Sequence, residues 1–146
     1  MSFIIRKTKK DRIQIMPRRE LRENAFKMLF RLEFHGAEEM PEQLQLFEEE
    51  LSSLGDKDRE YLTTKCHAIF DCVEELDEAI NQVSQGWKTG RMSKVDLTII
   101  RLAVYEIRHE EDIPAPVSIN EAVELAKKYG TDDSASFVNG ILAKFV

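Results

Sequence analysis

The segment 97–107 is apolar on almost every face, and this constrains the fold more than any other feature of the chain. Only three residues within it are polar: Thr98, Arg101 and Glu106. Ser93, followed three residues later by Asp96, resembles a helix N-cap and predicts that a helix begins here. A helix that is apolar nearly all round has to be covered by its neighbours. The segment therefore predicts the central helix of a helical bundle.

Helical spacing of apolar residues recurs along the rest of the chain, and no run alternates as a strand would. Pro17 predicts the start of a first helix that continues up to Gly36. Pro41 predicts a second helix that ends at Gly55, and Asp56 or Asp58 is expected to cap a third. A fourth segment extends through Leu76, Ile80 and Val83 to Gly86 and Trp87, with acidic residues at its start. These 146 residues predict one all-α domain.

The stretch 118–142 predicts two helices joined by a tight corner. Ser118 and Glu121 form a capping box, so a helix is expected to begin there. Gly130 follows the last apolar position and is expected to be a left-handed C-cap. The polar residues at 131–133 would supply acceptors for the N-terminus of the next helix.

Gly140 lies inside the second of these helices, where it costs about 1 kcal/mol relative to Ala. A cost of that size suggests that another backbone packs close to Gly140 or that something binds there. We interpret Gly140 and its neighbours in the motif as structural residues that cap, form the corner or pack closely: Asn120, Glu121, Asn139 and Gly140.

Charge is distributed unevenly over a chain whose net charge is −6. Residues 1–31 contain ten Lys or Arg and three acidic residues. Residues 32–146 contain eleven Lys or Arg and 24 acidic residues. A basic end on an acidic body directs a polyanion to one place. We interpret residues 1–16 as a disordered basic arm or as an upstream extension. The second interpretation arises because Met16 could be the true start. Residues 17–146 are expected to form the folded domain. Residues 16–31 alone retain a balance of +3.

Several protein classes fit the sequence poorly. No apolar run is long enough to span a membrane, no signal peptide is evident, and a cytoplasmic protein is expected. Cys66 and Cys72 match no zinc pattern. A Gly-rich phosphate loop, a nucleophile elbow and an H-E-x-x-H pair are all lacking. We therefore expect neither catalysis nor a cofactor or metal.

Three binding or structural roles remain open from the residues alone. A DNA-binding helix-turn-helix is disfavoured, because the segment 133–145 carries a single cation, Lys144, and a large apolar face. RNA binding draws on the arginines of the first helix together with nearby aromatic side chains. A purely structural or oligomerising bundle fits the composition as well.

Three motifs in order resemble the family of the bacterial transcription antitermination factor NusB. The segment 18–30 is similar to the Arg-rich opening of that family, and 100–107 is similar to its L-R-[IL]-A-x-Y-E-[IL] run. The segments 119–127 and 137–142, I-N-E-A-V-E-L-A-K and F-V-N-G-I-L, are similar to its signature. The resemblance covers nearly all of residues 17–145, whereas residues 1–15 match nothing in it.

The resemblance implies an all-α, NusB-like bundle of about seven helices, with two small sub-bundles around a central apolar helix. It implies binding of single-stranded boxA RNA from ribosomal RNA leader transcripts together with the ribosomal protein NusE, in an antitermination complex with RNA polymerase. The residues implied to meet RNA are Arg18, Arg19, Arg22, Asp133 and Phe137. Those implied to face the protein partner are Phe30 and Phe34. Many family members have Tyr at position 30, so the phenylalanine of this chain lacks their hydroxyl group. A homodimer is also possible, since dimers occur in the family.

One alternative lies close to this family. A similar helical domain occurs at the N-terminus of certain rRNA cytosine methyltransferases, where it guides RNA to a catalytic domain. The present sequence contains no G-x-G-x-x-G-like loop for a cofactor. We therefore expect the chain to act without chemistry of its own.

Overall fold

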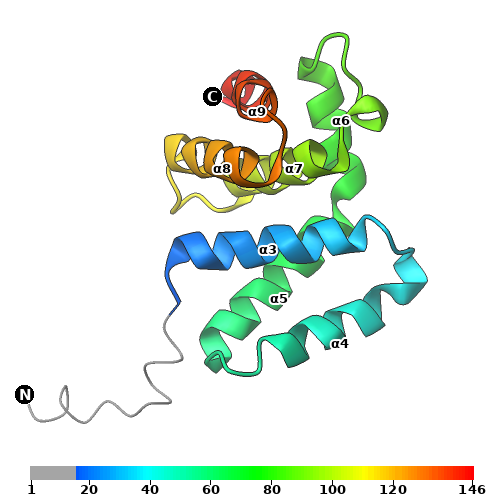
Figure 1. Ribbon diagram of the computed structural model, residues 1–146, viewed down its shortest axis with the longest axis vertical. Coiled ribbons are helices and arrows are strands. Elements are labelled where there is room, and N and C mark those ends of the chain that lie inside the picture. The colour runs from blue at the N-terminus through cyan, green and yellow to red at the C-terminus, as the bar shows by residue number, and fades with distance from the viewer. Residues whose placement is uncertain (1–15) are drawn as a thin grey trace, which may run out of the picture. The chain divides into compact units, whose positions relative to one another are not determined.

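The computed structural model describes residues 16–146, which contain seven α-helices, three short 3-10 helices and no strand (Figure 1). The prediction of an all-α fold of about seven helices is confirmed. The described residues form two compact units with a boundary between His67 and Ala68. The predicted basic arm, residues 1–16, lies outside the described residues except for Met16. No helix of the described part is long and apolar enough to cross a bilayer.

The first unit contains α3 (Arg18–Leu32), η1 (Ala37–Glu39), α4 (Met40–Glu50) and most of α5 (Asp56–Asp71). Pro17 is the N-cap of α3, as its position predicted. Two boundaries differ from the predictions. Helix α3 ends at Leu32 rather than at Gly36, and α4 ends at Glu50, before a turn that leads to Gly55.

The core of the first unit is formed by one face of each helix. It consists of Leu21, Ala25, Phe26, Met28, Leu29, Leu32, Met40, Leu44, Phe47, Leu51, Leu62 and Cys66. The Cys66 thiol lies 3.9 Å from the carbonyl oxygen of Ala25, which places α5 directly against α3. The backbone N–H of Met16 donates a 3.0 Å hydrogen bond to the Asp58 carboxylate. These contacts fix where α3 begins relative to α5.

The second unit contains the end of α5, α6 (Val73–Val83), η2 (Thr89–Arg91), α7 (Lys94–His109), α8 (Ala115–Tyr129), α9 (Ser134–Leu142) and η3 (Ala143–Phe145). Helix α8 lies along α7, and α9 packs against both (Figure 1). Nine of the sixteen residues of α7 are buried, as its apolar sequence predicted. The predicted N-cap is confirmed, because the Ser93 hydroxyl accepts a 3.1 Å hydrogen bond from the Asp96 N–H.

The prediction that a capping box at Ser118 starts the next helix is wrong. Helix α8 begins three residues earlier, at Ala115, with Pro114 as N-cap and Pro116 in the first turn. Proline suits this position because the first helical N–H groups have no intrahelical acceptor. Ser118 is 1% exposed, and its hydroxyl donates a 2.7 Å hydrogen bond to the carboxylate of Glu106, which is fully buried. The serine joins α8 to α7 and does not cap a helix.

The predicted left-handed C-cap at Gly130 is also wrong. Gly130 is extended, with φ of −94° and ψ of −166°. A Cβ at this position would lie 2.8 Å from the carbonyl oxygen of Ala126 and would overlap the side chain of Ser134. Glycine is therefore required by close packing at the corner and not by a left-handed backbone.

The start and interior of α9 differ from expectation in two further ways. Asp133 is the N-cap residue but makes no side-chain capping bond; instead the Ser134 hydroxyl accepts a 2.9 Å hydrogen bond from the Thr131 N–H. Gly140 is exposed, and a Cβ added there would meet nothing within 4 Å. The interpretation of Gly140 as a closely packed structural residue is therefore wrong, and nothing in its described surroundings requires a glycine.

Candidate nucleic-acid interface

Arg18 and Arg19 occupy the first two positions of α3, and both are exposed. Cations are unfavourable at a helix N-terminus, because the partial charge of the helix dipole there is positive. Two adjacent arginines add to this positive potential, and Pro17 provides no side-chain cap. Arginine side chains together with a helix N-terminus are well suited to hold a phosphate group.

Arg22, the third arginine predicted to meet RNA, is only 7% exposed. It lies on the same side of α3 as Ala25 and Phe26, both of which belong to the core. Its long side chain therefore contributes to the packing of the first unit, whatever else its guanidinium does. The structure thus separates Arg22 from the two exposed arginines that precede it.

Arg31, at the other end of α3, is engaged by an acidic residue. Its guanidinium donates to both carboxylate oxygens of Glu50, at 3.0 and 3.1 Å. This pair joins the last turn of α3 to the last turn of α4. Glu50 offsets much of the positive charge of Arg31, and the two exposed arginines of α3, Arg18 and Arg19, lie at its other end.

Phe30 and Phe34 continue an aromatic row that begins in the core of the first unit. The rings of Phe26 and Phe30 stack at 5.9 Å, and those of Phe30 and Phe34 meet edge-on at 5.1 Å. Exposure rises along the row from 3% at Phe26 to 58% at Phe34, with Phe30 half-buried. With a rise of 1.5 Å per residue, α3 extends about 21 Å from Arg18 to Leu32, and Phe34 lies in the turn that follows. The two predicted binding ends of α3 are therefore well separated.

Asp133 and Phe137 lie one turn apart at the start of α9, in the second unit. The N–H of Phe137 donates a 3.0 Å hydrogen bond to the carbonyl oxygen of Asp133. Asp133 is exposed and Phe137 is half-buried. Between them they present a carboxylate acceptor and part of an aromatic ring on the same side of the unit.

The ring of Trp87 meets that of Phe137 edge-on, with centroids 6.1 Å apart and planes inclined by 73°. Trp87 is 52% exposed, and the guanidinium of Arg91 lies 5.9 Å from its ring centroid. From the sequence, Trp87 was predicted only to end a helical segment. The overlooked signal is the interleaving of Trp87 with the cations Lys88, Arg91 and Lys94, with no acidic residue between positions 84 and 95.

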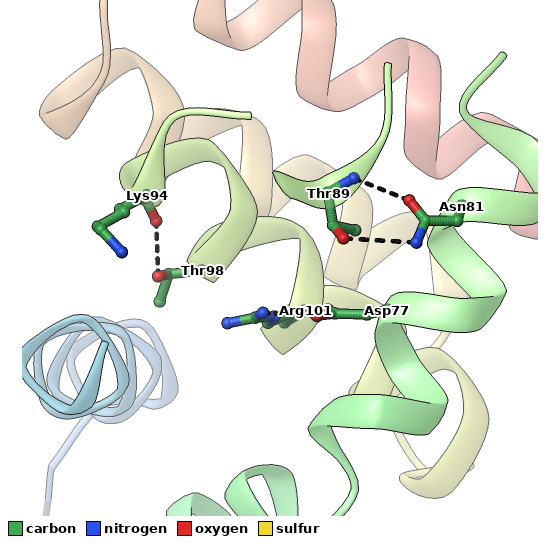
Figure 2. Close-up of polar contacts among 6 residues, drawn as sticks. All are labelled: Asp77, Asn81, Thr89, Lys94, Thr98 and Arg101. Atoms are coloured by element: carbon green, nitrogen blue, oxygen red, sulfur yellow. Dashed lines mark hydrogen bonds and ion pairs between the residues drawn. The ribbon is translucent and has the colours of Figure 1, made fainter. Parts of the chain in front are cut away.

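The segment that carries Trp87 is held against α6 by Asn81. The Asn81 carboxamide accepts a 2.8 Å hydrogen bond from the Thr89 N–H and donates to the Thr89 hydroxyl at 3.4 Å (Figure 2). Helix α6 is in turn joined to α7 by Asp77, whose two carboxylate oxygens accept from Arg101 at 2.7 and 2.6 Å. Figure 2 shows Asp77 and Asn81 pointing to these two partners from the same helix.

Comparison with known proteins identifies the group to which this architecture belongs. Residues 19–146 match the profile of the NusB family. The chain belongs to the NusB family. The match confirms the resemblance inferred from the three sequence motifs.

Two curated NusB relatives are similar over almost their whole length. The transcription antitermination protein NusB of Agathobacter rectalis is 61% identical over 130 residues, which cover 89% of this chain and 99% of the relative. That of Lachnoclostridium phytofermentans is 51% identical over 131 residues, with coverages of 90% and 99%. The solved structure of T. maritima NusB superposes with a TM-score of 0.78 at 37% identity and covers 88% of this chain and 89% of its own.

The described residues of this NusB-family chain contain no group of three or more His, Cys, Asp or Glu side chains that could hold a metal ion. The cysteine thiols are also shielded. Burial raises the pKa of Cys66 to about 12. The pKa of Cys72 is also raised, mainly by partial burial and to a smaller extent by the negative charge of Glu75. The described surface instead presents arginine side chains, which can bind phosphate groups, and aromatic rings, which can stack on bases.

Proposed function

We propose that this chain is a transcription antitermination factor. It binds the single-stranded boxA element of ribosomal RNA leader transcripts together with NusE, and the complex joins RNA polymerase. Membership of the NusB family, and the antitermination name of relatives matched over 99% of their length, support this function. The same relatives favour it over an RNA-guiding appendage of a methyltransferase.

The pair of exposed arginines at the start of α3 is the observation on which the proposal chiefly rests. Arg18 and Arg19 are exposed where the helix dipole already favours an anion. RNA phosphates would make charge-assisted hydrogen bonds with the two arginines and would also lie at the positive end of the helix dipole. Phosphate contacts of this kind position an RNA but do not select its sequence.

Base recognition is assigned to the start of α9. Sequence-specific RNA recognition takes unpaired bases that stack on aromatic rings and are read at their edges. Phe137 supplies a half-buried ring, and the exposed carboxylate of Asp133 accepts hydrogen bonds from amino groups of bases. Both residues lie within one helical turn, so the ring and the carboxylate can contact the same or neighbouring bases.

Partner binding is assigned to the C-terminal end of α3. Phe34 is one of the most exposed large apolar side chains of the described residues, and Phe30 connects it to the core. An aromatic side chain anchored in this way is typical of the centre of a protein interface. Because the C-terminal end of α3 lies about 21 Å along the helix from Arg18, NusE and RNA phosphates would not compete for the same surface.

The test measures the binding of two labelled RNAs, one boxA-like and one with the same bases scrambled, at two salt concentrations, with and without NusE. We expect preference for the boxA-like RNA, tighter binding when NusE is present, and weaker binding at high salt. Equal binding of both RNAs under all conditions would reject sequence-specific recognition and favour a structural bundle. Sedimentation of the protein in the same buffer, with and without RNA, shows whether a homodimer forms and whether RNA dissociates it.

A further inference from the structure

We propose that Trp87 and Arg91 form a base-stacking site that binds a nucleotide of the RNA beside Phe137. The inference rests on the proposed RNA-binding function and adds residues to it. It commits to a single-stranded RNA base as the ligand, held by stacking on the Trp87 indole and by the cation of Arg91. The site lies entirely within the second unit.

The first argument is the arrangement of the three side chains. Trp87 is 52% exposed although its ring is in contact with Phe137 at 6.1 Å. The edge-on contact, with planes inclined by 73°, uses an edge of one of the two rings and leaves much of the indole surface in solvent. A base that stacks on the indole would lie close to the base that the proposed function places on Phe137. Two aromatic rings at this distance are suited to successive nucleotides of one strand.

The second argument is the local charge. Residues 84–95 carry Lys88, Arg91 and Lys94 and no acidic residue, within a region from 32 to 146 that is strongly acidic. Arg91 is exposed and already lies 5.9 Å from the Trp87 ring centroid. A positively charged segment with an aromatic ring is the composition that binds single-stranded nucleic acid. A surface for an uncharged protein segment would not need these cations.

Hydrogen bonds already fix the backbone on both sides of Trp87 in the free protein. Gly86 has φ of +82°, so the chain turns sharply after α6, and the Trp87 N–H donates a 2.9 Å hydrogen bond to the Ser84 carbonyl. Asn81 fixes Thr89 two residues later through both groups of its carboxamide (Figure 2). Lys144 donates a 2.9 Å hydrogen bond to the carbonyl of Val83 and so joins the end of α6 to the segment after α9. A ring held in this way loses little conformational entropy when a base binds.

Because Trp87 is the single tryptophan of the chain, it reports directly on its own surroundings. The experiment titrates the full-length protein with the boxA-like RNA and follows tryptophan emission, while the anisotropy of a label on the RNA measures binding independently. We expect the emission of Trp87 to be quenched in parallel with the rise in anisotropy. We expect Trp87→Ala to weaken RNA binding by roughly 5- to 150-fold, the range that corresponds to one stacked base, and Trp87→Phe to recover much of the loss.

A second variant and a control complete the experiment. Arg91→Ala is expected to weaken binding, because it removes the cation beside the stacked base. Leu46→Ala, which truncates an exposed apolar side chain on α4, is expected to leave RNA affinity unchanged. Circular dichroism of each variant verifies that it folds.

The outcomes separate this inference from the proposed function. If anisotropy shows RNA binding while Trp87 emission stays constant and Trp87→Ala binds normally, the stacking site is rejected and the proposed function stands. If the boxA-like RNA does not bind at all, both are rejected. If emission responds to NusE alone and not to RNA, Trp87 belongs to a protein interface and the inference is wrong. The wild-type emission decides the matter even if Trp87→Ala fails to fold.

Discussion

The hydroxyl of Ser118 donates a 2.7 Å hydrogen bond to the carboxylate of Glu106, twelve residues earlier in the chain. Glu106 is fully buried, and Ser118 is 1% exposed. A buried carboxylate is costly unless it is hydrogen-bonded. The bond therefore stabilises a polar group in the most apolar helix of the chain and at the same time joins α7 to α8.

Ser118→Ala is expected to destabilise the protein by about 1–3 kcal/mol, because it removes one hydrogen bond from a buried carboxylate. Urea denaturation measures the change in the free energy of unfolding. Ser136→Ala, on the exposed side of α9, is the matched control and is expected to stay within about 0.5 kcal/mol of the wild type. Equal stability of both variants would show that Glu106 is fully satisfied without Ser118.

Replacing Gly130 or Gly140 with alanine is expected to change the stability of the protein in opposite directions. Gly130→Ala places a Cβ against Ser134 and 2.8 Å from the Ala126 carbonyl oxygen, so the corner has to shift and stability falls. Gly140→Ala meets open space within a helix and is expected to raise stability by about 1 kcal/mol. Thermal unfolding of the two variants compares them. A loss of stability in Gly140→Ala would contradict the open surroundings of that residue.

The arginines of α3 are expected to divide into two classes. Arg18→Ala and Arg19→Ala should each weaken RNA binding and lower the salt slope by about 0.7, with little change in stability. Arg22→Ala should lower the stability of the protein, because its side chain is 7% exposed and packs beside the core. The readouts are RNA affinity at several salt concentrations and urea denaturation. An unchanged slope in both exposed variants would place the phosphate contacts on other residues.

Phe30 and Phe34 are expected to differ in the same manner. Phe34→Ala removes a largely exposed ring and should abolish or weaken NusE binding with little effect on stability. Phe30→Ala removes the half-buried ring that contacts both Phe26 and Phe34, so it should reduce NusE binding and stability together. Calorimetric titration with NusE and thermal unfolding distinguish the two effects. Normal NusE binding by Phe34→Ala would remove this end of α3 from the interface.

Thiol reactivity tests the burial of the cysteines. Because burial raises the pKa of Cys66 from 9.0 to about 12, this thiol stays neutral and unreactive in the folded protein at ordinary pH. The pKa of Cys72 is also raised, chiefly by burial, but its side chain is partly exposed, so it should react slowly. We expect a thiol reagent to label Cys72 in the native protein and Cys66 only after denaturation. Rapid native labelling of Cys66 would show that the α3–α5 contact opens.

The raised pKa of Cys66 also makes the stability of the folded protein depend on pH. Below pH 9 the thiol is neutral in the folded and the unfolded protein, so it has no effect on how stability varies with pH. Above pH 9 the unfolded state releases the proton and the folded state does not, until pH approaches 12. Stability should therefore fall as pH rises through this window, and Cys66→Ala should reduce that part of the fall.

Much of the fold was predictable because it depends on local composition. The apolar segment 97–107 required coverage on all sides, and the Ser93 cap was confirmed along with the helix that follows it. The capping box at Ser118 failed because the same residues also suit a buried contact, and the prolines at 114 and 116 already define the helix start. Sequence spacing does not show that Glu106 lies opposite Ser118.

The candidate site was predictable to a smaller extent. The burial of Arg22 could have been inferred, since it shares the helical face of Ala25 and Phe26. The contact between Trp87 and Phe137 could not, because it joins residues fifty positions apart through the packing of α9 on α7 and α8. The exposure of Gly140 likewise depends on which face of α9 the unit covers.

The anchor of the Trp87 segment is a neutral carboxamide, and this affects how later measurements should be interpreted. Asn81 carries no charge and does not titrate, so neither added salt nor a change of pH weakens its two bonds to Thr89 through screening or protonation. The position of η2 should consequently stay constant across the ionic strengths used in binding studies. Any electrolyte sensitivity of RNA affinity at Trp87 can then be assigned to the nucleic acid and the cations it meets, and not to a rearrangement of the protein.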